Sequence, residues 1–115
     1  MPLLKLSTNA NIKDEQKNEL LKSLSSLLAS ATGKPEQYVM VVIERADILM
    51  SGGGGDSAFV EVKSLGALEP FTVKKLSKKI CDLLSASLDI SPVRVYINFT
   101  DVPANLWAWN GKPFG

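Results

Sequence analysis

The sequence predicts an α/β domain, an α+β sandwich in which one β-α-β unit occurs twice. Residues 2–44 and 58–100 align with each other, and each half places a helical apolar stripe between two strand-like runs. A crossover between parallel strands is right-handed, so both helices are expected on one face of a four-stranded sheet. A chain of 115 residues is long enough for one domain, and we expect residues 1–115 to form it.

The strands of the two halves correspond in order. Residues 2–6 (Pro-Leu-Leu-Lys-Leu) align with residues 58–62 (Ala-Phe-Val-Glu-Val) as the first strand of each half. After one extra residue, the second strands follow a proline and are expected over residues 38–43 and 94–99. Each half is therefore interpreted as strand, helix, strand.

Each predicted helix carries one apolar stripe with α-helical spacing. The stripe of the first half consists of Leu20, Leu21, Leu24, Leu27, Leu28 and Ala31, and that of the second of Val73, Leu76, Ile80, Leu83, Leu84 and Leu88. Gly33 followed by Pro35 is typical of a helix end. Pro70 is tolerated near the start of the second helix, and Pro92 lies beyond its end.

The sheet face away from the helices is expected to be too apolar for water, because Met40, Val42, Phe59 and Val95 are assigned to it. A sheet that is apolar on both faces needs a second cover, and only two helices are available. A partner subunit is the natural source of that cover, so the sequence predicts an obligate oligomer.

Composition excludes several classes of function. The chain has no histidine, which excludes Ser-His-Asp and Cys-His nucleophilic sites and the usual metal ligands. Its single cysteine, Cys81, cannot form an internal disulfide or a zinc site and is interpreted as a small buried residue. The 13 basic and 12 acidic residues nearly cancel. We therefore expect no cofactor, metal, nucleic-acid or membrane partner, and a soluble cytoplasmic protein, since no signal segment or membrane-spanning run is visible.

Two irregular segments remain. Residues 51–56 contain four consecutive glycines, but a strand follows and no Gly-Lys-Ser/Thr is present, which favours a flexible connector over a phosphate-binding loop. The tail, residues 106–115, holds Trp107 and Trp109. It is interpreted as an edge strand plus turn, or as the wall of a pocket.

Pro2 gives the chain a candidate general base. Methionine before a small residue such as proline is usually trimmed during synthesis, and trimming would leave a secondary amine fixed at the edge of a folded core. The pKa of an α-amino group is ordinarily about 7.7–8.0, and burial or a nearby cation lowers it. Proton transfer needs a base poised near neutral pH, which such an amine would supply.

A set of short motifs accompanies Pro2. They are the Met1-Pro2 start, Thr8-Asn9, residues 31–35 (Ala-Thr-Gly-Lys-Pro), Gln37-Tyr38, residues 64–66 (Ser-Leu-Gly), residues 90–98 (Ile-Ser-Pro-Val-Arg-Val-Tyr-Ile-Asn), Trp109-Asn110 and Phe114. With these motifs the whole chain resembles the macrophage migration inhibitory factor branch of the tautomerase superfamily. The resemblance implies a symmetric homotrimer with the sheets inside and the helices outside, and active sites between subunits.

The resemblance also implies an activity and a set of site residues. The activity is cofactor-independent keto–enol tautomerisation of phenylpyruvate-like carboxylates, with Pro2 as the catalytic base. Lys34 would pair with the substrate carboxylate and lower the pKa of the amine, whereas the simpler interpretation of Lys34 is a cation near a helix end. The other substrate-binding residues that it implies are the backbone of Leu65, Tyr96 and Asn98 from the neighbouring subunit, and Trp109 and Phe114 as an apolar wall.

Two positions depart from the family's pattern. Residues 57–60 read Ser-Ala-Phe-Val where members with thiol-disulfide activity carry Cys-x-x-Cys, so that redox chemistry is not expected. Trp107 stands where familiar members have a small aliphatic residue, and it is a further candidate for contact with substrate. Animal members act as extracellular cytokines, so receptor binding is the alternative function, although no feature of this sequence supports a receptor partner.

Overall fold

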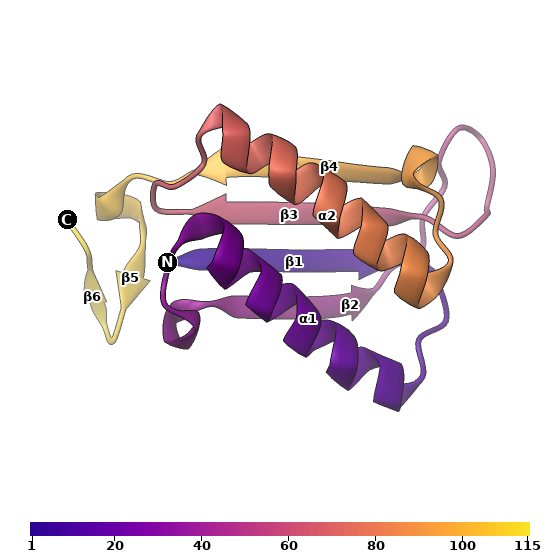
Figure 1. Ribbon diagram of the computed structural model, residues 1–115, viewed down its shortest axis with the longest axis horizontal. Coiled ribbons are helices and arrows are strands. Elements are labelled where there is room, and N and C mark those ends of the chain that lie inside the picture. Colours follow the sequence, from indigo (N-terminus) through magenta and orange to yellow (C-terminus); the bar gives the residue numbers. More distant parts are fainter.

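The computed structural model describes residues 1–115 and contains a four-stranded sheet with two long helices on one face (Figure 1). The first β-α-β unit consists of β1 (Pro2–Thr8), α1 (Asp14–Thr32) and β2 (Met40–Arg45). The second unit consists of β3 (Ala58–Ser64), α2 (Pro70–Leu88) and β4 (Val95–Asp101). The predicted fold class is confirmed, and neither long helix has the length and apolar character needed to cross a membrane.

Shorter elements lie at the ends of the sheet. Three single-turn 3-10 helices each begin at a proline or directly after one: η1 (Glu36–Tyr38), η2 (Pro92–Arg94) and η3 (Ala104–Leu106). The tail forms a small antiparallel hairpin of β5 (Ala108–Trp109) and β6 (Lys112–Pro113). Proline fixes φ near the helical value, which favours a turn of this kind at each position.

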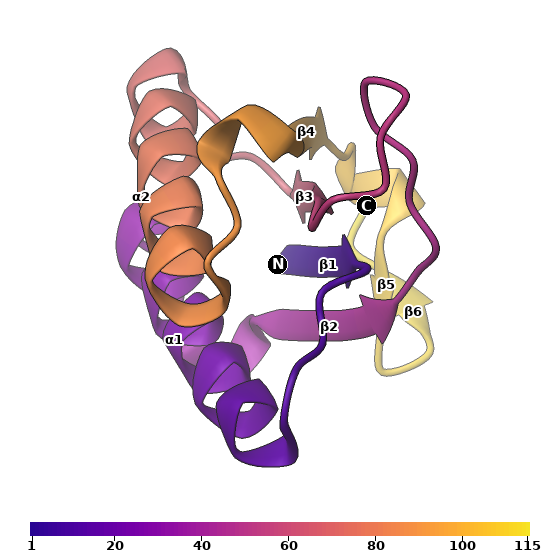
Figure 2. The same ribbon diagram turned by 90° about the vertical axis from the view of Figure 1, so that its right-hand side faces the viewer.

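The strand order is β2-β1-β3-β4, with β1 parallel to β2, β3 parallel to β4, and β1 antiparallel to β3. Figure 2 shows both helices on the same side of this sheet. Pro2 pairs with Ser64, so the start of β1 lies beside the end of β3. At the other end of β1, Thr8 pairs with Arg45. The start and the end of β1 therefore lie at opposite ends of the sheet along the strand direction.

The core fills the space between the helices and the sheet. The predicted stripes supply the helical part of it, with Leu20, Leu24 and Leu28 buried on α1 and Leu76, Ile80, Leu84 and Leu88 buried on α2. Each such side chain contributes about 1.5–3 kcal/mol to the free energy of unfolding when it is fully buried. Gly33 ends α1 in the left-handed conformation, with φ 71°, and Pro70 is the first residue of α2. Cys81 packs against this core.

The open face of the sheet, away from the helices, is mixed rather than apolar. Met40, Val42 and Phe59 lie on it as predicted, but Val95 pairs with buried Ala58 and belongs to the core. Polar side chains alternate with the apolar ones: Lys5, Glu44, Glu61 and Lys63. Lys5 and Glu44 form an ion pair at 3.2 Å. The strands therefore alternate more cleanly than the sequence suggested, because paired residues must face the same side.

The glycine-rich segment is tied down rather than left as a free connector. The Arg94 guanidinium donates hydrogen bonds to the carbonyl oxygens of Met50, Gly53 and Gly55 at 3.0–3.3 Å. From the other side, the Asn9 amide donates to the Gly55 carbonyl at 3.2 Å and accepts from the Ser57 backbone N–H at 2.8 Å. The loop is thus held by two side chains that are distant from it in sequence.

Candidate active site

A cavity of about 320 Å³ lies at the N-terminal end of β1. It is lined by Met1, Lys34, Pro35, Tyr38, Leu65, Trp109 and Phe114. These residues come from the start of the chain, the end of α1, the end of β3 and the C-terminal tail. Four predicted site residues, Lys34, Leu65, Trp109 and Phe114, are therefore brought together around the N-terminus.

The N-terminus itself is built into the sheet. Pro2 is buried, and the Met1 carbonyl accepts a hydrogen bond from the Leu65 backbone N–H at 3.3 Å. Burial, and then the charge of Lys34, lower the pKa of the Met1 amino group below its usual range. While Met1 is attached, the nitrogen of Pro2 is a tertiary amide and cannot bind a proton. The amine that titrates here is then the one on Met1.

Lys34 supplies the positive charge of this cavity. It follows the left-handed residue Gly33, and its backbone N–H donates to the Thr32 hydroxyl at 3.3 Å. The lysine lies beyond the last turn of α1, which contains no basic residue. Because the ammonium forms no ion pair within the chain, it is available to an anion in the cavity.

Aromatic rings form the apolar wall. Trp109 packs edge-on against Tyr38, with ring centroids 6.2 Å apart and planes at 89°. Tyr38 was not predicted as a site residue, because its position in sequence indicated only the start of a strand; the turn of η1 places it at the cavity. Trp107 does not line the cavity. The Trp107 carbonyl accepts a hydrogen bond from the Phe114 N–H at 2.9 Å. The backbone of Trp107 therefore helps to position Phe114, whose ring lines the cavity.

Tyr96 and Asn98 lie elsewhere within one chain. Both are on β4, exposed on the open face of the sheet, and β3 separates this strand from β1. Tyr96 retains 69% of its accessible surface. Neither residue lines the cavity at Met1. The single chain therefore assembles Lys34, Leu65 and the aromatic wall, but not these two side chains.

Trp109→Ala is expected to weaken binding of an aromatic carboxylate about fivefold, because a ring pair contributes about 1 kcal/mol beyond area burial. Trp107→Ala is the matched control and is expected to leave this affinity within a factor of two. A titration followed by tryptophan fluorescence measures both, since a bound aromatic carboxylate should quench Trp109. Quenching that persists in Trp109→Ala and disappears in Trp107→Ala would show that the two rings were assigned the wrong way round.

Comparisons with known proteins agree over the full length of the chain. The family model described as macrophage migration inhibitory factor (MIF) matches residues 1–115. The chain is 38% identical to macrophage migration inhibitory factor from Xenopus tropicalis, with 99% of each chain covered. It is 34% identical to the homolog from Brugia malayi, with 100% of each covered. The crystal structure of the homologue from Prochlorococcus marinus matches with a TM-score of 0.93 and 39% identity, over 98% of this chain and 99% of that one. The chain therefore belongs to the macrophage migration inhibitory factor family.

Proposed function

We propose that the protein is a keto–enol tautomerase of arylpyruvate-like carboxylates and that the Pro2 amine, exposed by removal of Met1, is its general base. The observation that carries the proposal is the cavity at the N-terminus, where Lys34 and three aromatic rings surround the start of β1. The test is turnover of enol-form arylpyruvates by protein whose N-terminal residue has been identified by mass. Absence of turnover by protein that begins at Pro2 would overturn the proposal.

Removal of Met1 changes two groups at once. The nitrogen of Pro2 becomes a secondary amine, held at the edge of the sheet by the pairing of Pro2 with Ser64. The Leu65 N–H loses the Met1 carbonyl as its partner. A backbone donor without a partner at the edge of a cavity is suited to a substrate oxygen, and its position is fixed by the end of β3.

The reaction needs only the movement of a proton. The substrate carboxylate pairs with Lys34, and the aromatic ring of the substrate packs against Trp109 and Phe114. In the ketonising direction the amine, once protonated by the enol O–H, returns a proton to the adjacent carbon; in the reverse direction it takes that C–H proton. Burial and the charge of Lys34 lower the pKa of the Met1 amine, and the same two causes would favour the neutral, basic form of a Pro2 amine at the neighbouring position.

Lys34→Ala is expected to raise the KM for a carboxylate substrate about tenfold and to change kcat less, because the ion pair exists in both the ground state and the transition state. Lys34 lowers the pKa of the amine, so its removal should raise that pKa and move the rising limb of the pH–rate profile to higher pH. Lys22→Ala, an exposed lysine on α1, is the control. An unchanged KM with an unchanged pH profile would assign Lys34 a purely structural role.

The complete site is proposed to form between subunits of a homotrimer. A second copy on the open face would cover Met40 and Phe59, which retain 62% and 40% of their accessible surface. It would also bring Tyr96 and Asn98 of the partner subunit to the cavity at Pro2. There the Asn98 amide would donate to a substrate oxygen, and Tyr96 would contribute its hydroxyl and ring.

Sedimentation is therefore expected to give three times the chain mass at micromolar concentration.

Mixed trimers should reveal a site that is shared between subunits. Pro2→Gly and Asn98→Ala subunits each lack one half of that site. When the two are refolded together at random, about a quarter of the sites regain both halves. Activity well above the sum of the two separate variants is the expected result. A monomer, or mixtures without recovered activity, would contradict the shared site.

The name of the relative from Xenopus tropicalis favours a second candidate function, action on macrophages. One variant tests whether the two functions depend on the same group. Pro2→Gly, which replaces the constrained secondary amine with a primary one, should abolish most turnover, and a macrophage migration assay of the same variant then measures whether that action depends on the site.

A further inference from the structure

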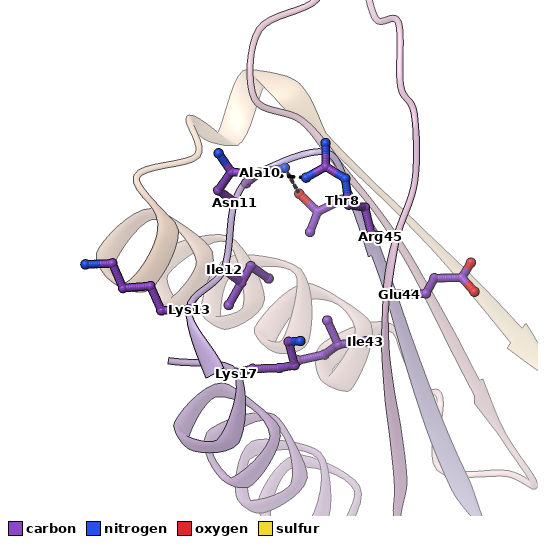
Figure 3. A pocket seen from close by; sticks show the side chains of 9 residues that line it. All are labelled: Thr8, Ala10, Asn11, Ile12, Lys13, Lys17, Ile43, Glu44 and Arg45. Atoms are coloured by element: carbon purple, nitrogen blue, oxygen red, sulfur yellow. Dashed lines mark hydrogen bonds between the residues drawn. The ribbon is translucent and has the colours of Figure 1, made fainter. Parts of the chain in front are cut away.

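A second cavity, of about 240 Å³, lies at the opposite end of β1 from Pro2. Figure 3 shows it where β1 and β2 end and the chain turns into α1. β1 has seven residues, so its two ends are about 20 Å apart at a rise of about 3.3 Å per residue. The lining of the second cavity includes Asn11, Ile12, Lys17, Ile43 and Arg45. The cavity is therefore separate from the proposed active site.

Two cations reach this cavity from different elements. Lys17 belongs to α1 and Arg45 to the end of β2, and Figure 3 shows Lys17 extending toward Ile43. Arg45 donates to the Asn11 side-chain oxygen at 3.0 Å and forms no ion pair. The one ion pair of Lys17 is with Asp14, at 3.7 Å, and that carboxylate is 99% exposed, so the pair is weak. Both charges are thus largely available to a ligand.

The acidic residue of the cavity wall does not cancel these charges. Glu44 accepts hydrogen bonds from Ser7 at 3.0 Å and pairs with Lys5 at 3.2 Å on the open face of the sheet. Those bonds lower the pKa of its carboxyl group, and in Figure 3 its side chain points away from the others. Lys13, also in the wall, adds a further positive charge, although its side chain points outward.

The remaining groups define the shape of a ligand. The Asn11 oxygen is occupied by Arg45, so its NH₂ group is left as a donor. The Thr8 hydroxyl is already used, because it donates to the Ser57 carbonyl at 2.6 Å and accepts from Ala10 N–H at 3.1 Å. Ile12 and Ile43 give the cavity an apolar part. A fitting ligand has a compact anionic group with several acceptor oxygens and a short apolar chain.

We propose that this cavity is a binding site for a small organic phosphate, a phosphomonoester with a short aliphatic group. A phosphate dianion matches two separated cations and accepts the forked hydrogen bonds of a guanidinium. A monocarboxylate would satisfy only one of the two charges. Arg45 pairs with buried Thr8 and so lies on the helix side of the sheet, whereas the trimer proposed above would cover the open face.

The test is a titration of the isotope-labelled full chain with n-butyl phosphate, followed by the backbone amide signals in NMR. Saturable shifts are expected at Ala10, Asn11 and Arg45, with no comparable change at Leu65. Pentanoate, which carries a similar aliphatic chain and a single charge, should bind about tenfold more weakly. Lys17→Gln and Arg45→Gln should each weaken butyl phosphate at least about fivefold, since each removes a hydrogen bond to a charged group.

Lys22→Gln on the same helix is the matched control and should bind like the parent chain. Turnover of arylpyruvate should stay unchanged in all three variants, because the two sites are at opposite ends of β1. The proposal is overturned if butyl phosphate gives no saturable shift at millimolar concentration, if the shifts centre on Leu65, or if both glutamine variants keep the parental affinity. Equal affinity for pentanoate would overturn the assignment to phosphate.

Discussion

Protein that retains Met1 is expected to turn over arylpyruvate enols at least about a hundredfold more slowly than protein processed to Pro2, because general-base catalysis contributes about 10²–10⁴ in rate. The reason is chemical rather than conformational. An acylated proline nitrogen has no lone pair available for a proton, and the carbonyl of the attached methionine, which lines the cavity, accepts the hydrogen bond of the Leu65 N–H. Retention of one residue would therefore remove the base and also occupy a backbone donor of the site.

The experiment compares two preparations of the same chain, one with Met1 removed and one in which an extra residue prevents removal. Mass spectrometry gives the N-terminal residue of each, and circular dichroism provides the control for folding. Pro2→Gly, processed to its N-terminal glycine, keeps an amine but makes it primary and less constrained. Its turnover rate should therefore fall strongly, but by less than the rate of the unprocessed chain. Equal rates for all three would place the base elsewhere.

The fold was predictable because its signals are local. The stripes on α1 and α2, Gly33 after α1 and Pro70 at the start of α2 are all set by neighbours within a few turns. The doubled β-α-β unit then follows from the handedness of the crossover. The side of the sheet on which Val95 lies was predicted incorrectly, because a one-residue error in strand phase exchanges the two faces.

The candidate site was predictable in part, but from the family resemblance rather than from local signals. Lys34 and Leu65 were expected there because of matching motifs, and the fold brings them to the start of β1 because they follow the ends of α1 and β3. Tyr38 could not be predicted, since a single turn of η1 decides that its ring meets Trp109 rather than the sheet. The role of Arg94 was also hidden: its partners lie about forty positions earlier in the chain and are backbone carbonyls, which carry no sequence signal.

Arg94→Gln is expected to reduce the free energy of unfolding by about 2–3 kcal/mol, since hydrogen bonds to a charged donor contribute about 1.5–3 kcal/mol each and part of that loss is recovered by water. The guanidinium makes five hydrogen bonds to the segment from Met50 to Ser57: the three carbonyl contacts already described, one to the Asp56 carbonyl at 3.1 Å and one to the Ser57 hydroxyl at 3.0 Å. Glutamine has one NH₂ group and a shorter reach. The loop would lose most of its attachment to the start of β4.

Denaturant unfolding at equal protein concentration measures this loss, and limited proteolysis shows where it acts. Cleavage should become faster within residues 50–56, while the cavity at Met1 keeps its ligand affinity because it lies at the other end of the sheet. Arg45→Gln is the matched control, because that arginine is exposed and makes one hydrogen bond, to Asn11. Its replacement should lower the free energy of unfolding by less than about 1 kcal/mol. Arg94→Lys keeps the charge but not the fork of donors, and it should behave like Arg94→Gln if the hydrogen bonds hold the loop. A stable Arg94→Lys variant with a protected loop would show instead that the charge alone is sufficient.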